Sequence, residues 1–250
     1  MKAAEKIFAE LDGDYSKIPT LDQATKLNFL VNIGSFYKIQ EKFEDALKYF
    51  TDALAVYTTS SETYDKGYVD ICLNIGQLYH NKGDYYEAIT WYENCLEKVS
   101  DLESSLKFSI LQSMGETYFK IKDYSNAIKY FQMALELDIK DDVFHAAVYK
   151  SMGKVFRKKG ELKKAEEYLN KALQSSLKNL GEENEITAGT YQEFGNVYVK
   201  QKQLDKAAEN YMKALDINRK LYGDSSRKLI KCYHDIAKYF EEMEDFDNAR

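Results

Sequence analysis

Apolar and polar residues follow one another along most of the chain with the period of an amphipathic α-helix. Around residue 76, apolar positions at intervals of three and four residues predict one helix, which carries Val69, Cys72, Leu73, Ile75 and Tyr79. Beyond Gly83 and Asp84, the same spacing predicts a second helix, which carries Tyr85, Ala88, Ile89, Tyr92, Cys95 and Leu96. Glycine readily takes the positive φ of a helix end, and Asp84 is a suitable cap with Glu87 three residues later. The block is therefore predicted to be a pair of helices joined by a tight turn.

This block recurs through the whole chain at intervals of 38 to 42 residues. Five glycines have an aromatic residue three positions later and an alanine twelve positions later: Gly34, Gly76, Gly115, Gly153 and Gly195. A sixth copy has Ala237 in place of the glycine and keeps Phe240 and Ala249. A period of this length is typical of stacked supersecondary units. The fold class is therefore predicted to be all-α, a solenoid of antiparallel helix pairs.

Small residues at the glycine and alanine positions allow the two helices of a pair to approach closely. A bulky residue stands sixteen positions after each glycine: Phe50, Tyr92, Phe131, Leu169 and Tyr211. Since no single pair can bury its apolar face, stability is expected to come from contacts between neighbouring pairs.

The ordered series of small and aromatic positions resembles the tetratricopeptide repeat family over roughly residues 21–250. This resemblance implies a right-handed superhelix with about five full repeats and a partial sixth. The repeats are longer than the usual length of about 34 residues and look like those of kinesin light chains and Pins-type adaptors.

The predicted organisation is a capping helix with a linker over residues 1–19, followed by the repeat array over residues 20–250. The expected repeats span residues 20–60, 61–100, 101–140, 141–181, 182–223 and 224–250, the last of them partial. A solenoid needs a polar cap at its end. We therefore expect the protein to continue past Arg250, or a partner to cover this end.

Composition narrows the class of protein further. The net charge of −6 gives no reason to expect nucleic-acid binding. The chain has three cysteines, an odd number without close spacing, which argues against a framework of disulfides. A reducing compartment is therefore expected. With neither a signal-peptide core nor a membrane-length apolar stretch in view, a cytoplasmic protein is predicted.

The sequence offers little that points to catalysis. Its three histidines, His80, His145 and His234, do not form a metal-binding H-E-x-x-H motif, and its glycines are accounted for by helix packing and helix ends. The cysteines fall at core positions and are read as packing residues. We therefore predict a protein that is not an enzyme and that uses neither cofactor nor metal.

In the resembling family, the first helix of each pair forms the concave surface. Its exposed positions are expected two residues before the glycine and one, four and five residues after it. In the second and third repeats these positions hold Asn74, Gln77, His80, Asn81, Ser113, Glu116, Phe119 and Lys120. Asn32 and Asn74 occupy equivalent positions, and Asn196 stands one residue after its glycine. Amides can hold the backbone of an extended peptide, although Asn32 and Asn74 could equally bond within the array.

Basic residues gather in the third and fourth repeats and complete the predicted groove. They are Lys120, Lys150, Lys154, Arg157 and Lys158. On one concave wall they would favour an acidic segment of a partner, whereas Glu116 and Glu193 could instead balance them on a solvated face.

Two functions remain from the sequence. The first is an adaptor or scaffold that binds a peptide or helical segment of a partner protein in its groove. The alternative is a sensor or regulatory region of a larger protein whose effector or enzymatic domain lies outside these residues. The sequence does not identify the partner.

Overall fold

The computed structural model describes residues 22–60, 66–98, 103–139 and 143–224, together with 226, 229–230, 232–234 and 236–237. The described residues form ten α-helices, with further helical residues between 229 and 237, and no β-strand. They divide into two compact units, with the boundary between Ile121 and Lys122. The capping helix and linker predicted over residues 1–19 lie outside the described residues.

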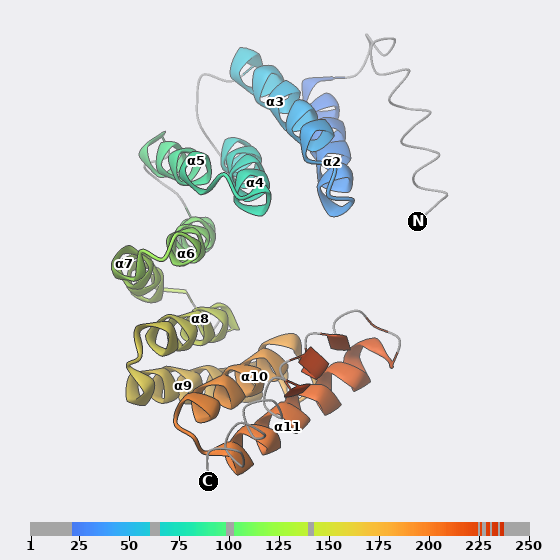
Figure 1. Cartoon of the computed structure of the whole chain (residues 1–250). Helices are drawn as coiled ribbons and strands as arrows, with labels where there is room; N and C mark the ends of the chain where they lie inside the picture. Colours follow the sequence, from blue (N-terminus) through green and yellow to red (C-terminus); the bar gives the residue numbers. More distant parts are fainter. Residues whose placement is uncertain are drawn as a thin grey trace. The chain divides into compact units, whose positions relative to one another are not determined.

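The first unit contains two helix pairs and the first helix of a third. Its helices are α2 (Gln23–Ile39), α3 (Phe43–Ser60), α4 (Lys66–Lys82), α5 (Tyr85–Lys98) and α6 (Ser104–Lys120). Within the pairs, α2 packs on α3 and α4 packs on α5 (Figure 1). Between pairs, α4 contacts both α2 and α3, and α6 contacts both α4 and α5. The first helices of successive pairs therefore form a continuous row, which positions the candidate site described below.

The second unit repeats this arrangement. Its helices are α7 (Tyr124–Leu135), α8 (Val143–Lys159), α9 (Leu162–Leu180), α10 (Glu185–Lys200) and α11 (Leu204–Tyr222). Here α8 packs on α9 and α10 packs on α11, while α10 also contacts α8 and α9 (Figure 1). Beyond α11, Leu229 and Cys232 are buried against Leu215. The predicted all-α fold of antiparallel helix pairs is confirmed.

The core glycines allow a bulky side chain to reach the backbone of the neighbouring helix, as the spacing of sixteen residues predicts. A Cβ atom placed on Gly76 would lie 2.3 Å from the ring of Tyr92, and one on Gly195 would lie 2.4 Å from the ring of Tyr211. The corresponding distance from Gly153 to Leu169 is 2.7 Å. These distances are too short for a methyl group without movement of its neighbour. Glycine is therefore required at these positions by packing.

The turn between the two helices of a pair has the same backbone conformation in every described pair. Seven residues after each core glycine position, φ is positive: 59° at Glu41, 97° at Gly83, 65° at Lys122, 83° at Gly160 and 60° at Lys202. The left-handed conformation is strained for residues that carry a Cβ atom. Glycine, which avoids this strain, stands at only two of the five equivalent turns, Gly83 and Gly160.

Replacement of Glu41 by glycine is expected to raise the free energy of unfolding by about 0.5–1 kcal/mol, because relief of the strained φ exceeds the entropy that glycine adds to the unfolded chain. Urea unfolding followed by circular dichroism measures this change. Gly83→Ala is the matched control and should lower stability by about 1 kcal/mol. A Glu41→Gly variant less stable than the wild type would contradict the argument.

The helices α2 and α6 begin in different ways. The cap of α2 is Asp22, whose Oδ1 accepts a hydrogen bond from the backbone N–H of Thr25 at 2.9 Å. The cap of α6 is Glu103, which makes no side-chain capping bond.

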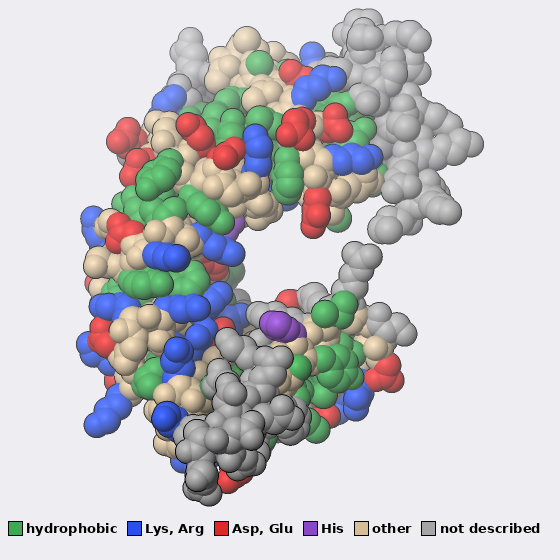
Figure 2. All heavy atoms as spheres, in the orientation of Figure 1, with side chains coloured by type: hydrophobic (Ala, Val, Ile, Leu, Met, Phe, Trp, Pro, Cys, Tyr) green, Lys and Arg blue, Asp and Glu red, His purple; other side chains and the backbone are tan. Residues whose placement is uncertain are grey.

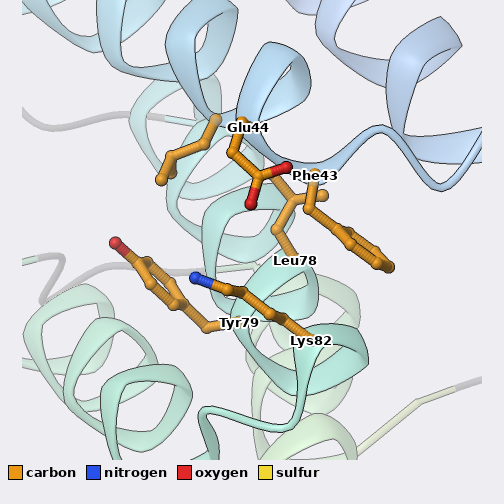
Figure 3. Close-up of a pocket in the computed structure, with 6 residues that line it drawn as sticks. Phe43, Glu44, Leu78, Tyr79 and Lys82 are labelled. Carbon is orange, nitrogen blue, oxygen red and sulfur yellow. The ribbon is translucent and has the colours of Figure 1, made fainter.

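A small void remains where α3 meets α4. Figure 3 shows Phe43 and Glu44 of α3 across from Leu78, Tyr79 and Lys82 of α4. The void measures about 30 Å³, which is room for little more than a water molecule. It is too small for a ligand and shows how closely the aromatic residues fill the space between pairs.

Candidate partner-binding site

Polar side chains on the first helices connect neighbouring repeats to each other. At the junction of α2 and α4, the Lys38 ammonium donates to Asn74 Oδ1 at 2.6 Å and to Gln77 Oε1 at 3.1 Å. The Asn74 amide also donates to the backbone carbonyl of Asp70 at 2.8 Å. Burial lowers the pKa of Lys38. Asn74 is therefore engaged inside the array, as one of the two readings of the sequence anticipated.

The next junction, between α4 and α6, is connected by a histidine. His80 Nδ1 lies 2.8 Å from Thr117 Oγ1, and the Thr117 hydroxyl donates to the backbone carbonyl of Ser113 at 2.7 Å. Since a hydroxyl has one proton, Thr117 accepts from His80, and Nδ1 carries the imidazole hydrogen. Burial lowers the pKa of His80, and the nearby Lys120 lowers it further. His80 is thus held as a neutral ring whose Nε2 is an acceptor.

In the second unit, a buried ion pair connects α8 to α10. Nη2 of Arg157 lies 2.9 Å from Oε2 of Glu193, and Nε of Arg157 donates to the same oxygen at 3.0 Å. Both side chains are only 11% exposed. The sequence reading of Glu193 as a balancing charge is right, but the pair lies inside the packed helices and not on a solvated face.

All three junctions follow one rule. The residue four positions after one glycine reaches a residue on the next first helix, 36 or 37 positions further along. The repeat pattern predicts an exposed groove at these positions, but in the structure their side chains bond to the next first helix. The sequence does contain a signal for this pairing: a polar residue is followed, nearly one repeat length later, by a residue with complementary hydrogen-bonding groups or charge.

An open polar pocket of about 230 Å³ lies between α4 and α6. Its lining residues are Gln77, His80, Asn81, Tyr92, Ser113 and Glu116. Five of these six come from the positions that the sequence assigned to the inner surface. Tyr92, from α5, is 1% exposed, and burial raises the pKa of its hydroxyl group. The pocket is therefore a site at which two successive first helices present hydrogen-bonding groups together.

The other predicted groove residues are placed as follows. Asn32 is exposed on α2, whereas Asn196 Oδ1 accepts a hydrogen bond from the Tyr211 hydroxyl at 3.0 Å. Lys120 is exposed at the end of α6 in the first unit. On α4, Gln77 lines the polar pocket, whereas Asn74 bonds to Lys38 and to the carbonyl of Asp70. Contact of each of these residues with a partner remains a prediction.

The remaining four basic residues share helix α8 in the second unit. Lys150 and Lys154 are half-buried and Lys158 is exposed, while Arg157 is committed to Glu193. Figure 2 shows Lys and Arg side chains gathered over α7, α8 and α9. A basic surface on this unit is therefore built from lysines, with the charge of Arg157 neutralised.

The state of His80 leads to a pH-dependent stability. The unfolded chain protonates His80 near its ordinary pKa of 6.5, whereas the folded chain resists protonation because its pKa is lowered. Below pH 6.5 the unfolded state therefore binds more protons, and stability falls as the pH falls. Thermal unfolding between pH 7 and pH 5 should show a smaller decrease for His80→Asn, in which the amide replaces the Nδ1 donor. Equal pH slopes for the two proteins would refute this account.

The three cysteines are buried, and none of them forms a disulfide. Cys72 of α4 and Cys95 of α5 are in contact, and the hydrogen bond that the Cys95 thiol donates to Cys72, together with burial, raises the pKa of Cys95. Within the described ranges, no group of three His, Cys, Asp or Glu side chains could hold a metal ion. None of the helices in that part of the chain is long and apolar enough to cross a membrane.

Curated proteins of several kinds match parts of this chain. It is 32% identical over 122 residues to the anaphase-promoting complex subunit CDC16 of Saccharomyces cerevisiae, a match over 45% of this chain and 14% of that protein. It is 27% identical over 135 residues to the photosystem I assembly protein Ycf3 of Acaryochloris marina, covering 53% of this chain and 78% of that protein. The chain spans 12% of human intraflagellar transport protein 88 homolog, at 24% identity over 43% of this chain.

Solved structures share the fold at low sequence identity. The apo form of the quorum sensor NprR from B. thuringiensis has a TM-score of 0.72 and 19% identity, over 96% of this chain and 67% of that one. A putative kinesin light chain with nearly identical repeats from Podosopora anserina has a TM-score of 0.64 and 14% identity, over 80% of this chain and 98% of that one. At these identities the likeness shows the fold alone.

Sequence models of one repeat family also match this chain. One tetratricopeptide repeat model matches residues 68–140, 142–219 and 186–250, and a second matches residues 27–60. Together these matches cover most of the chain and confirm the resemblance found in the spacing of small and aromatic residues. The chain belongs to the tetratricopeptide repeat family.

Proposed function

We propose that this chain is a protein-interaction module that holds an extended or short helical segment of a partner against the first helices of its pairs. It would act as an adaptor or scaffold and perform no catalysis. The observation that carries this proposal is the polar pocket between α4 and α6. It lies where two first helices meet, and its lining is rich in side chains that donate and accept hydrogen bonds.

The chemistry of the pocket suits a polypeptide. The amides of Gln77 and Asn81 each offer donors and an acceptor, which match the carbonyl and N–H groups of a peptide backbone. Gln77 is already oriented, because its Oε1 accepts from Lys38 at 3.1 Å. An oriented amide loses less conformational freedom when a partner binds. The Lys38 junction therefore supports the site as well as the packing of α2 against α4.

The lysines of α8 support a second element of the proposal. Exposed Lys158 and half-buried Lys150 and Lys154 would attract an acidic segment of the partner. The contribution of Arg157 to this attraction is small because Glu193 neutralises it. Binding through these lysines should weaken as salt rises to physiological concentration.

A selection of proteome-derived peptides displayed on phage tests the proposed function. The chain is the bait, and the double variant Gln77→Ala, Asn81→Ala is the counter-selection. Asn94→Ala is the matched control, because it removes an exposed amide from α5 that does not line the pocket. We expect peptides that bind the wild type and the control but fail on the double variant. If the double variant retains its thermal stability and its full set of peptides, the proposed site is wrong.

The alternative function is a sensor or regulatory region within a larger protein. The chain spans 14% of the CDC16 protein and 12% of the intraflagellar transport protein 88 homolog, so the matched repeats form a small part of those two proteins. In such a protein the same surface would receive an intramolecular or signalling peptide and pass the change to another domain. The sequence of the full-length protein distinguishes this alternative from a free-standing adaptor.

A further inference from the structure

We propose that the pocket between α4 and α6 selects a basic side chain, arginine or lysine, as the anchor residue of the bound segment. This inference rests on the proposed function and adds the chemistry of the residue that is recognised. The pocket measures about 230 Å³, many times the roughly 10–15 Å³ that a cavity needs to hold one water. It therefore has room for the polar end of a long side chain.

The imidazole of His80 contributes an acceptor to this pocket. Its Nδ1 hydrogen is donated to Thr117, whose own proton is donated to the Ser113 carbonyl. The remaining ring nitrogen, Nε2, therefore carries a lone pair in the neutral ring. The cation of Lys120 and partial burial both favour that neutral form. A ligand that reaches His80 must bring an N–H or O–H donor.

Glu116 supplies the charge. It is the one acidic side chain among the residues that line the pocket, and no lysine or arginine lines it. Its Oε1 accepts a hydrogen bond from Gln112 at 3.1 Å, one turn earlier on α6. A carboxylate can accept about four hydrogen bonds, so this single bond does not saturate Glu116. Hydrogen bonds between a cationic donor and a carboxylate are stronger than neutral ones.

Two cations near the pocket do not reverse its preference. The Lys38 ammonium is held by Asn74 and Gln77 and is not part of the lining. Lys120 also lies outside the lining, and its effect is to keep His80 an acceptor. An acidic side chain entering the pocket would face the Glu116 carboxylate and the His80 lone pair. A guanidinium or ammonium group would satisfy both.

Small-molecule probes test the side-chain preference directly. N-acetyl-arginine N-methylamide is titrated into the ¹⁵N-labelled chain, and the side-chain amide signals of Gln77 and Asn81 are followed by NMR. The matched probes are the citrulline analogue, which has nearly the same shape without the charge, and the glutamate analogue. We expect saturable shifts with the arginine probe and at least about tenfold weaker binding of the other two. Equal or tighter binding of the citrulline or glutamate probe would overturn the inference.

Two variants locate the effect in the pocket. Glu116→Gln keeps an oxygen that can accept from Gln112 and should weaken the arginine probe about tenfold. His80→Asn keeps the donor to Thr117, removes the Nε2 acceptor and should weaken the probe severalfold. Glu87→Gln is the control, because Glu87 is an exposed carboxylate on α5 outside the lining. If Glu116→Gln binds the probe like the wild type, the inference is wrong.

The peptide selection separates failure of this inference from failure of the proposed function. Peptides that share a basic position and are lost on Glu116→Gln would support both. Peptides that require Gln77 and Asn81 but share no basic position would support the proposed function and overturn the inference. If no peptide is enriched, the proposal that the chain binds an extended or helical peptide is wrong. The titration with the arginine probe then decides independently whether the pocket prefers a cation.

Discussion

Replacing Arg157 by alanine is expected to lower the free energy of unfolding by about 3 kcal/mol. The substitution leaves the Glu193 carboxylate in a site where it is only 11% exposed, without the two nitrogen atoms that donate to its Oε2. An unpaired buried charge costs more than the pair itself contributes. Urea unfolding of the whole chain, followed by circular dichroism, measures the loss.

A double replacement provides the control for this result. Arg157→Met together with Glu193→Leu removes both charges and fills the space with apolar groups, so most of the lost stability should return. Arg157→Lys should lie between the two, since an ammonium retains the charge but not the forked geometry of the guanidinium. If the double variant is as unstable as Arg157→Ala, loss of packing and not the unpaired charge is responsible.

The second large effect is expected from Gly195→Ala, which should lower the free energy of unfolding by about 2 kcal/mol. The new methyl group would lie 2.4 Å from the ring of Tyr211, which is itself buried. Alanine favours a helix over glycine by about 1 kcal/mol, so the overpacking must exceed this gain. Thermal unfolding of the variant compared with the wild type tests the size of the net loss.

The same helix contains the matched control. Gly189 also lies on α10, but a Cβ atom there would have Lys150 Nζ as its nearest neighbour, at 3.3 Å. The end of a flexible lysine can move away, so Gly189→Ala should raise stability by about 0.5–1 kcal/mol through helix propensity alone. A destabilising Gly189→Ala or a neutral Gly195→Ala would mean that these positions are not distinguished by packing.

The pairs that connect successive repeats also bear on binding. Residues such as Lys38 and Arg157 occupy positions that sequence analysis assigned to an exposed groove, yet each bonds to the next first helix. A partner that used these groups would have to replace an existing hydrogen bond or ion pair. Recognition is therefore expected at groups that these junctions orient but leave available, such as the amide nitrogen of Gln77 and Nε2 of His80.

The helix pairs and their close packing could be predicted because their signals are local. Gly76 and Tyr92 are sixteen residues apart within one pair, and the period of 3.6 residues determines which faces meet. The turn at Glu41 could not be read in the same way. Its positive φ is imposed by the two packed helices that it joins, although the residue itself does not favour that conformation.

The sequence by itself determined that this chain is a repeat protein of paired helices, because periodicity and small residues specify each pair locally. The tertiary structure alone decided which polar groups pair across repeats. His80 meets Thr117 and Arg157 meets Glu193 only because successive first helices pack with a particular offset and rotation. That geometry is the joint result of many apolar contacts between pairs, and no single position in the sequence encodes it. For the same reason, the pocket between α4 and α6 and the contact of Cys72 with Cys95 became visible only in the folded chain.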